Sequence, residues 1–95
     1  MLEEIKIRSD FGHIKVEFFK GIPFIHVYVH TWSKSNARKC KAYEQVLVTL
    51  LKTMGFKKMF SLIPKNDPFI LKWNLKWGMK QIKELENDYM MERDI

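Results

Sequence analysis

Residues 43–63 read YEQVLVTLLKTMGFKKMFSLI, and this stretch decides the fold. Its first half repeats apolar residues at i, i+3, i+4, i+7, i+8 and i+11, which predicts an amphipathic helix whose buried stripe comprises Tyr43, Val46, Leu47, Leu50, Leu51 and Met54. Gly55 stands at the C-cap position of that helix. Residues 57–63 then predict a strand that is closed by Pro64.

Upstream of this helix, three segments have the composition of strands. Ile5–Arg8 and the first half of His13–Phe19 alternate apolar and polar residues, and Phe24–Thr31 is rich in aromatic and β-branched residues. The short turns between them, at 9–12 and 20–23, predict an antiparallel meander. The helix is expected to begin at one of three competent N-caps, namely Ser33, Ser35 and Asn36.

Downstream, Asp67 is a helix cap and Pro68 suits a first helical turn, so a second helix is expected to run to Gly78. Residues 79–85 and 89–93 then predict a final hairpin. The predicted order is β-β-β-α-β-α-β-β in a single domain spanning 1–95. We expect an α/β (α+β) fold with a mixed, mostly antiparallel sheet, in which crossover helices make at least two neighbouring strands parallel.

Composition excludes several classes of protein. With 46% hydrophobic residues the chain can form a core, and its one cysteine, Cys40, allows neither an internal disulfide nor a thiolate metal cluster. We expect no metal site, since His26 and His30 would lie about 13 Å apart along a strand. The chain has no apolar run long enough for a membrane helix, and residues 1–4 lack the features of a secretion signal. A cytoplasmic protein, or one carried within a virion, is expected.

Charge is concentrated in the middle of the chain. Residues 34–83 hold twelve basic and two acidic side chains, a net charge of +10, whereas the whole chain carries +6. Such a segment predicts an anionic partner, which is a phosphorylated cofactor, a nucleic acid or an acidic protein surface. The alternative is a lysine-rich face exposed to solvent.

Residues 24–95 resemble the core of the GNAT superfamily of N-acetyltransferases. The resemblance lies in the order and spacing of five pieces: a strand ending near Val29-His30-Thr31, a helix ending in Met54-Gly55-Phe56, a strand at 58–63, a capped helix ending in Trp77-Gly78, and a terminal strand at 88–95. The family normally begins with a further strand and two helices, for which we find no counterpart here. Very short relatives occur among phage and mobile-element proteins, and we expect a minimal, degenerate member of that type.

The resemblance implies a site for the pyrophosphate of acetyl-CoA in an Arg/Gln-x-x-Gly-x-Gly/Ala loop that opens the long helix. The corresponding residues are 36–41, which contain no glycine. Arg38, Lys39 and Lys41 stand there instead, and long side chains obstruct the close backbone approach that glycine permits. We therefore favour a loop that no longer binds the cofactor and whose cations, with Lys34, face a partner or solvent. The alternative is that these side chains hold the anion themselves.

Other family positions also depart from the pattern. The tyrosine that often serves as general acid corresponds to Asn74, which has no proton to donate at neutral pH. The cofactor-contacting asparagine corresponds to Asn66 or Asp67, either of which is equally a plain helix cap. If the chain is an enzyme, the resemblance implies that the main chain of Val29 and Thr31 holds the pantetheine of acetyl-CoA.

Two further clusters bear on function. Glu17 and His30 are the candidate general bases of the enzyme hypothesis. Three tryptophans and three lysines could form a surface for nucleic acid, although core packing is the more common role of such tryptophans; they are Trp32, Trp73, Trp77, Lys34, Lys72 and Lys76. Cys40, next to cations near a helix start, is expected to have a lowered thiol pKa.

The leading hypothesis is a non-catalytic protein with a GNAT-like fold that binds another macromolecule, as a virion component, an assembly factor or a host-defence inhibitor. It predicts no cofactor, a protein partner that contacts Lys34, Arg38, Lys39 and Lys41, and possible self-association through sheet edges. One alternative is an acetyl-CoA-dependent N-acetyltransferase acting on an amine. A second is a nucleic-acid-binding protein that uses the basic segment 34–83.

Overall fold

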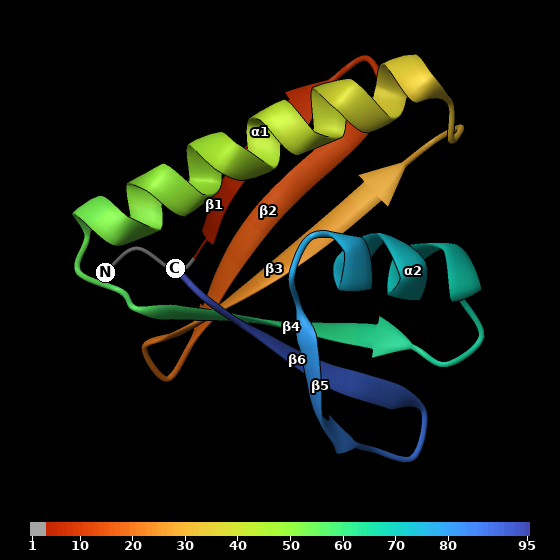
Figure 1. Ribbon diagram of the computed structural model, residues 1–95. Coiled ribbons are helices and arrows are strands. Elements are labelled where there is room, and N and C mark those ends of the chain that lie inside the picture. The colour runs from red at the N-terminus through yellow and green to blue at the C-terminus, as the bar shows by residue number, and fades with distance from the viewer. Residues whose placement is uncertain (1–3) are drawn as a thin grey trace.

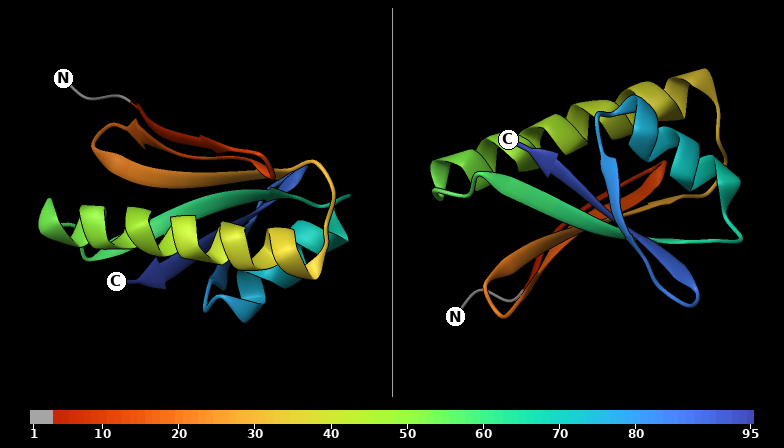
Figure 2. Two further views of the ribbon diagram at one scale, coloured as in Figure 1. Left: turned by 90° about the horizontal axis from the view of Figure 1, so that it is seen from above. Right: turned by 60° about the horizontal axis from the view of Figure 1, so that its bottom comes forward.

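Two helices lie on one face of a six-stranded sheet in the computed structural model, which describes residues 4–95 (Figures 1 and 2). The elements follow the predicted order and are β1 (Glu4–Ser9), β2 (Gly12–Phe19), β3 (Ile22–Val29), α1 (Lys34–Thr53), β4 (Lys58–Pro64), α2 (Pro68–Lys76), β5 (Lys80–Glu84) and β6 (Asp88–Asp94). Of the segment read for a secretion signal, residues 1–3 lie outside the described residues.

The sheet has the order β1-β2-β3-β4-β6-β5. Strands β1 to β3 form the predicted antiparallel meander, and β6 pairs antiparallel with both β4 and β5. Among neighbouring strands of residues 4–95, β3 and β4 are the one parallel pair, because α1 carries the chain back across the sheet between them. The expectation of a mixed, mostly antiparallel sheet with two helices is confirmed.

Gly12 is required where the first turn enters β2. Its φ is 144°, and a Cβ atom placed on it would lie 2.0 Å from the carbonyl oxygen of Tyr28. Only glycine lets the main chain of β2 approach β3 this closely. The pairing of β2 with β3 therefore depends on a missing side chain.

The larger core lies between α1 and the sheet. It joins the inward residues of β2, β3 and β4 to one face of α1, and its buried members include Ile14, Val16, Ile25, Leu47, Leu51 and Met59. A smaller cluster of Ile63, Met79 and Met91 packs under α2 with Ile70 and Leu71. Trp73 and Trp77, both partly buried, pack against the larger core, so the core role of these tryptophans is confirmed.

The predicted stripe of α1 is only partly correct. Leu47 and Leu51 are buried, but Val46, Leu50 and Met54 are exposed. The buried face is instead Cys40, Glu44, Leu47, Val48 and Leu51. The difference arises because a glutamate occupies the centre of the buried face, which shifts that face away from the one that hydrophobicity alone indicates.

Candidate functional site

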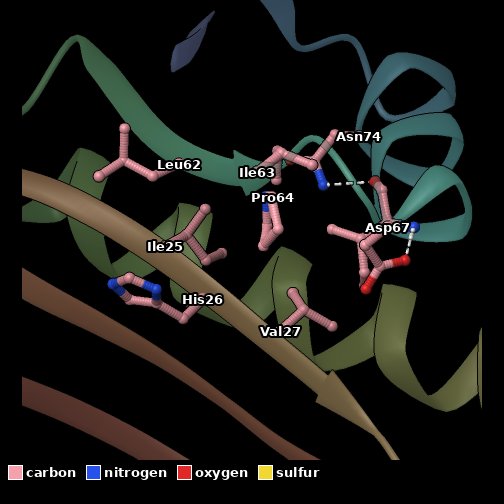
Figure 3. A pocket seen from close by; sticks show the side chains of 9 residues that line it. Ile25, His26, Val27, Leu62, Ile63, Pro64, Asp67 and Asn74 are labelled. Atoms are coloured by element: carbon pink, nitrogen blue, oxygen red, sulfur yellow. Dashed lines mark hydrogen bonds between the residues drawn. The ribbon is translucent and has the colours of Figure 1, made fainter. Parts of the chain in front are cut away.

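A cleft separates β3 from β4 beyond the single position at which they pair, Phe24 with Phe60 (Figure 3). From that position the two strands diverge, and α2 lies beside the gap (Figure 1). The cleft has a volume of about 230 Å³ and is lined by Ile25, His26, Val27, Leu62, Ile63, Pro64, Asp67, Ile70 and Asn74. An apolar cavity with a few polar groups is the ordinary form of a small-ligand site, although this one is smaller than the roughly 300 Å³ at which such pockets usually begin.

The start of α1 is fixed by Ser33, one of the three predicted caps. Its hydroxyl accepts a hydrogen bond from the main-chain N–H of Asn36 at 3.1 Å, and the Asn36 side chain donates to the carbonyl of Thr31 at 2.7 Å. Residues 36–41, which we expected to form a loop that no longer binds the cofactor, lie instead within the first two turns of α1. The expectation of a loop conformation was wrong because the segment contains no glycine or proline and Ser33 starts the helix ahead of it.

The cations at the start of α1 do not converge on one point. Lys39 points toward the β1–β2 turn, where its ammonium group lies 2.7 Å from the carboxylate of Asp10. The ion pair and hydrogen bond with Lys39 lower the pKa of Asp10. Lys34, Arg38 and Lys41 are exposed, and helical spacing places them on a different flank from Lys39.

The other residues proposed for cofactor binding have structural partners. Val29 ends β3 and packs against the core, and the carbonyl of Thr31 already accepts the bond from Asn36. Asn66 lines a shallow hollow outside the cleft, next to the β5–β6 turn. Asp67 lines the cleft itself, and its carboxylate caps α2 by accepting from the N–H of Ile70 at 3.1 Å.

The two candidate bases lie at opposite ends of the β2–β3 pair. Glu17 is opposite Phe24, whereas His30 follows the end of β3 and its ring contacts Tyr28 at 5.2 Å between centroids. No common site therefore brings Glu17 and His30 together. Each remains a separate prediction.

His26, which the sequence suggested only as a metal ligand, lines the cleft (Figure 3). Its Nε2 lies 3.4 Å from Oε1 of Glu17. Burial lowers the pKa of His26, so its imidazole is neutral near pH 7 and can accept a proton. The hydrogen bond from Lys15 at 2.8 Å lowers the pKa of Glu17. The signal in the sequence was alternation, which places His26 and Glu17 on the same face of neighbouring strands.

The side chain of Asn74, at the position of the family's tyrosine, is held by two hydrogen bonds. Its side-chain oxygen accepts from the hydroxyl of Ser61 at 3.1 Å, and its amide donates to the carbonyl of Ile70 at 2.8 Å. The side chain is buried and joins α2 to β4. These two bonds hold the amide in place, and an amide has no acidic proton to give at neutral pH.

The pKa of the Cys40 thiol differs from the sequence-based expectation. The residue is fully buried, and its thiol donates to the carboxylate of Glu44 at 3.1 Å. Burial, reinforced by the adjacent Glu44, raises the pKa of the Cys40 thiol far above its usual range. The prediction of a lowered pKa was wrong because the side chain lies on the core face of α1, away from the neighbouring cations.

The second face of the sheet carries no helix of residues 4–95 (Figure 2). A broad apolar groove of about 460 Å³ crosses it, lined by Glu17, Phe19, Phe24, His26, Leu62, Lys83, Leu85 and Met90. Glu17 and His26 thus stand where this groove meets the cleft. Over the same residues, no three metal-ligating side chains cluster together. Neither helix of the described chain is long and apolar enough to cross a membrane.

Comparison with solved structures places this architecture among known folds. The PaiA N-acetyltransferase of Thermoplasma acidophilum, solved in complex with coenzyme A, matches 99% of this chain with a TM-score of 0.82 at 16% identity. A domain from Methanocaldococcus jannaschii matches 100% of it with a TM-score of 0.81 at 18% identity. The chain spans 62% and 69% of these two structures. No family model and no curated protein matches the sequence. The chain has the fold of the GNAT N-acetyltransferases.

Proposed function

We propose that this chain acts by binding another macromolecule and that it does not transfer acetyl groups. The observation that carries the proposal is the start of α1. The Ser33 hydroxyl accepts a hydrogen bond from the N–H of Asn36. The residues that follow are helical and include Arg38, Lys39 and Lys41, which have long side chains. A diphosphate needs free helix N–H groups and close approach to the main chain. The residues present at this position do not fit the pyrophosphate of coenzyme A.

The partner proposed for this chain is anionic. Lys34, Arg38 and Lys41 are exposed on α1, and none of them takes part in an ion pair with the described residues. Unpaired cations on one side of a protein attract anionic surfaces and accelerate their association. This binding mode is compatible with each of the three roles set out above, namely virion component, assembly factor and host-defence inhibitor.

The cleft supports a second candidate function, acetyl-CoA-dependent N-acetyl transfer to an amine. It retains an opening between diverging parallel strands, and His26 with Glu17 borders it. A neutral imidazole at this position could accept the proton of an amine. The candidate ranks second because the position of the general acid holds Asn74, a buried amide that has no proton to give at neutral pH.

Titration of ¹⁵N-labelled protein with coenzyme A, followed by amide chemical shifts, tests the two functions against each other. Adenosine 3′,5′-bisphosphate is the matched ligand, since it carries phosphates and adenine but no pantetheine. We expect coenzyme A to leave the amides of His26 and Ile70 unshifted and to bind no better than the bisphosphate. Micromolar binding of coenzyme A with shifts along the cleft, together with acetylation of an amine, would establish the enzyme and exclude our proposal.

A further inference from the structure

A small aromatic hollow lies between α1 and α2. Two lysines and two tryptophans line it, namely Lys41 of α1 and Trp73, Lys76 and Trp77 around α2, and its volume is about 170 Å³. The ring of Trp32 lies 5.1 Å from that of Trp73 and extends the aromatic surface. We call this site the interhelix hollow. Its volume is too small for a whole cofactor, since small-molecule pockets usually exceed about 300 Å³, but it suits one planar ring.

A row of cations runs along α1 beside the interhelix hollow. Each helical residue turns by about 100°, so four cationic positions fall within about 60° of one another: Lys34, Arg38, Lys41 and Lys52. Because Lys41 lines the hollow, this flank of α1 borders α2. The row extends for about 27 Å at 1.5 Å per residue. Lys72 and Lys76, one turn apart, add two exposed cations on α2.

No acidic side chain of segment 34–83 neutralises this row. The segment has two, and both are occupied elsewhere: Glu44 is fully buried, and Asp67 caps α2. The ion pairs formed among residues 4–95 use other lysines, namely Lys15, Lys39, Lys58 and Lys65. Two cationic side chains, Lys41 and Lys76, therefore line the aromatic hollow, and four more lie exposed along the two helices that flank it.

We infer that this surface binds single-stranded nucleic acid, an inference that rests on the proposed function and names its partner. The row of cations follows the phosphate backbone, and one unstacked base enters the interhelix hollow beside Trp73 and Trp77. Aromatic surfaces flanked by cations bind single strands in this way, at about 1 to 3 kcal/mol per stacked base. An intact duplex does not offer a free base to the hollow, so charge complementarity and the aromatic lining together select a single strand.

Fluorescence anisotropy of a labelled oligo(dT) of about 12 nucleotides tests the inference. We expect binding at about 50 mM salt that weakens steeply as salt rises, with a log–log slope approaching −4 if all six cations engage phosphates. Changing both Lys41→Gln and Lys76→Gln should weaken binding at least about tenfold and flatten the slope. The matched control changes Lys6→Gln and Lys83→Gln, which removes the same charge from exposed positions on β1 and β5 and should weaken binding less than about twofold.

A second ligand distinguishes the contribution of the hollow to affinity from that of the cations without altering the protein. An abasic oligonucleotide of equal length keeps every phosphate, and its affinity should be at least about fivefold lower than that of oligo(dT). Equal affinity for the abasic strand, equal affinity for a duplex of that length, or an equal effect of the two double variants would overturn the assignment. So would the absence of binding at low salt. If this test fails while coenzyme A also does not bind, the proposed function stands with a different anionic partner.

Discussion

Trp73 of α2 donates its indole N–H to the carboxylate of Glu44, a fully buried residue at the centre of α1. The same carboxylate oxygen accepts from the thiol of Cys40, while Oε2 of Glu44 has no hydrogen-bond partner. A single acidic side chain thus joins the two helices that flank the interhelix hollow. Its ionisation affects the stability of both.

The first prediction concerns pH. Burial raises the pKa of Glu44 from 4.5 to about 7, so between these values the folded state retains a proton that the unfolded chain has released. Stability from this group is therefore highest below about pH 4.5, falls as pH rises to about 7, and is constant above that. At about 1.4 kcal/mol per pKa unit, the loss is on the order of 3 kcal/mol.

The variant Glu44→Gln isolates this effect. Glutamine retains the oxygen that accepts from Trp73 and Cys40, and it cannot ionise. In urea unfolding followed by tryptophan fluorescence, we expect the variant to gain stability relative to the natural chain between pH 5 and pH 8. Burial also lowers the pKa values of His13 and His26. Their effects on the free energy of unfolding are common to both proteins and cancel in the difference between them. A stability difference that does not change with pH would contradict the prediction.

Glu44 also explains what the sequence could and could not reveal. The order of elements was predictable, because the periods of strands and helices and the caps at Ser33 and Asp67 are local signals. The buried face of α1 was not predictable, because hydrophobic periodicity assigns a glutamate to solvent. Glu44 is buried in the core because it accepts a hydrogen bond from Trp73, 29 residues away. The contact of His26 with Glu17 was not predicted for the same reason, since it depends on strand register.

The second prediction is that Cys40 does not react in the folded protein. Thiol reagents attack the thiolate, and burial beside Glu44 opposes its formation. With a chromogenic disulfide reagent at pH 8, we expect less than one-tenth of the reaction rate that the urea-unfolded protein shows, the unfolded chain being the control. Reaction of the folded protein at the unfolded rate would show that α1 does not bury this side chain.

The third prediction tests the start of α1, on which the proposed function depends. Ser33→Ala removes the acceptor for the Asn36 N–H and should cost about 1 kcal/mol of stability. Ser35→Ala is the matched control, because Ser35 lies two residues further, within the first turn of the same helix, and its substitution should change stability by no more than a few tenths of a kcal/mol. Thermal unfolding by circular dichroism measures both. Equal losses would mean that the helix begins elsewhere and that residues 36–41 can form the loop expected from the resemblance.

The fourth prediction concerns the hairpin that holds His26 against Glu17. Gly12→Ala places a Cβ against the Tyr28 carbonyl in a backbone conformation that side chains rarely adopt, and it should cost at least about 2 kcal/mol. Gly21→Ala is the control, since Gly21 also has a positive φ, 78°, but a Cβ there meets nothing within 4 Å, so we expect a loss near 1 kcal/mol. Urea midpoints measure the difference. If the two losses are equal, backbone conformation accounts for both, and the close approach of β2 to β3 is not a constraint on the fold.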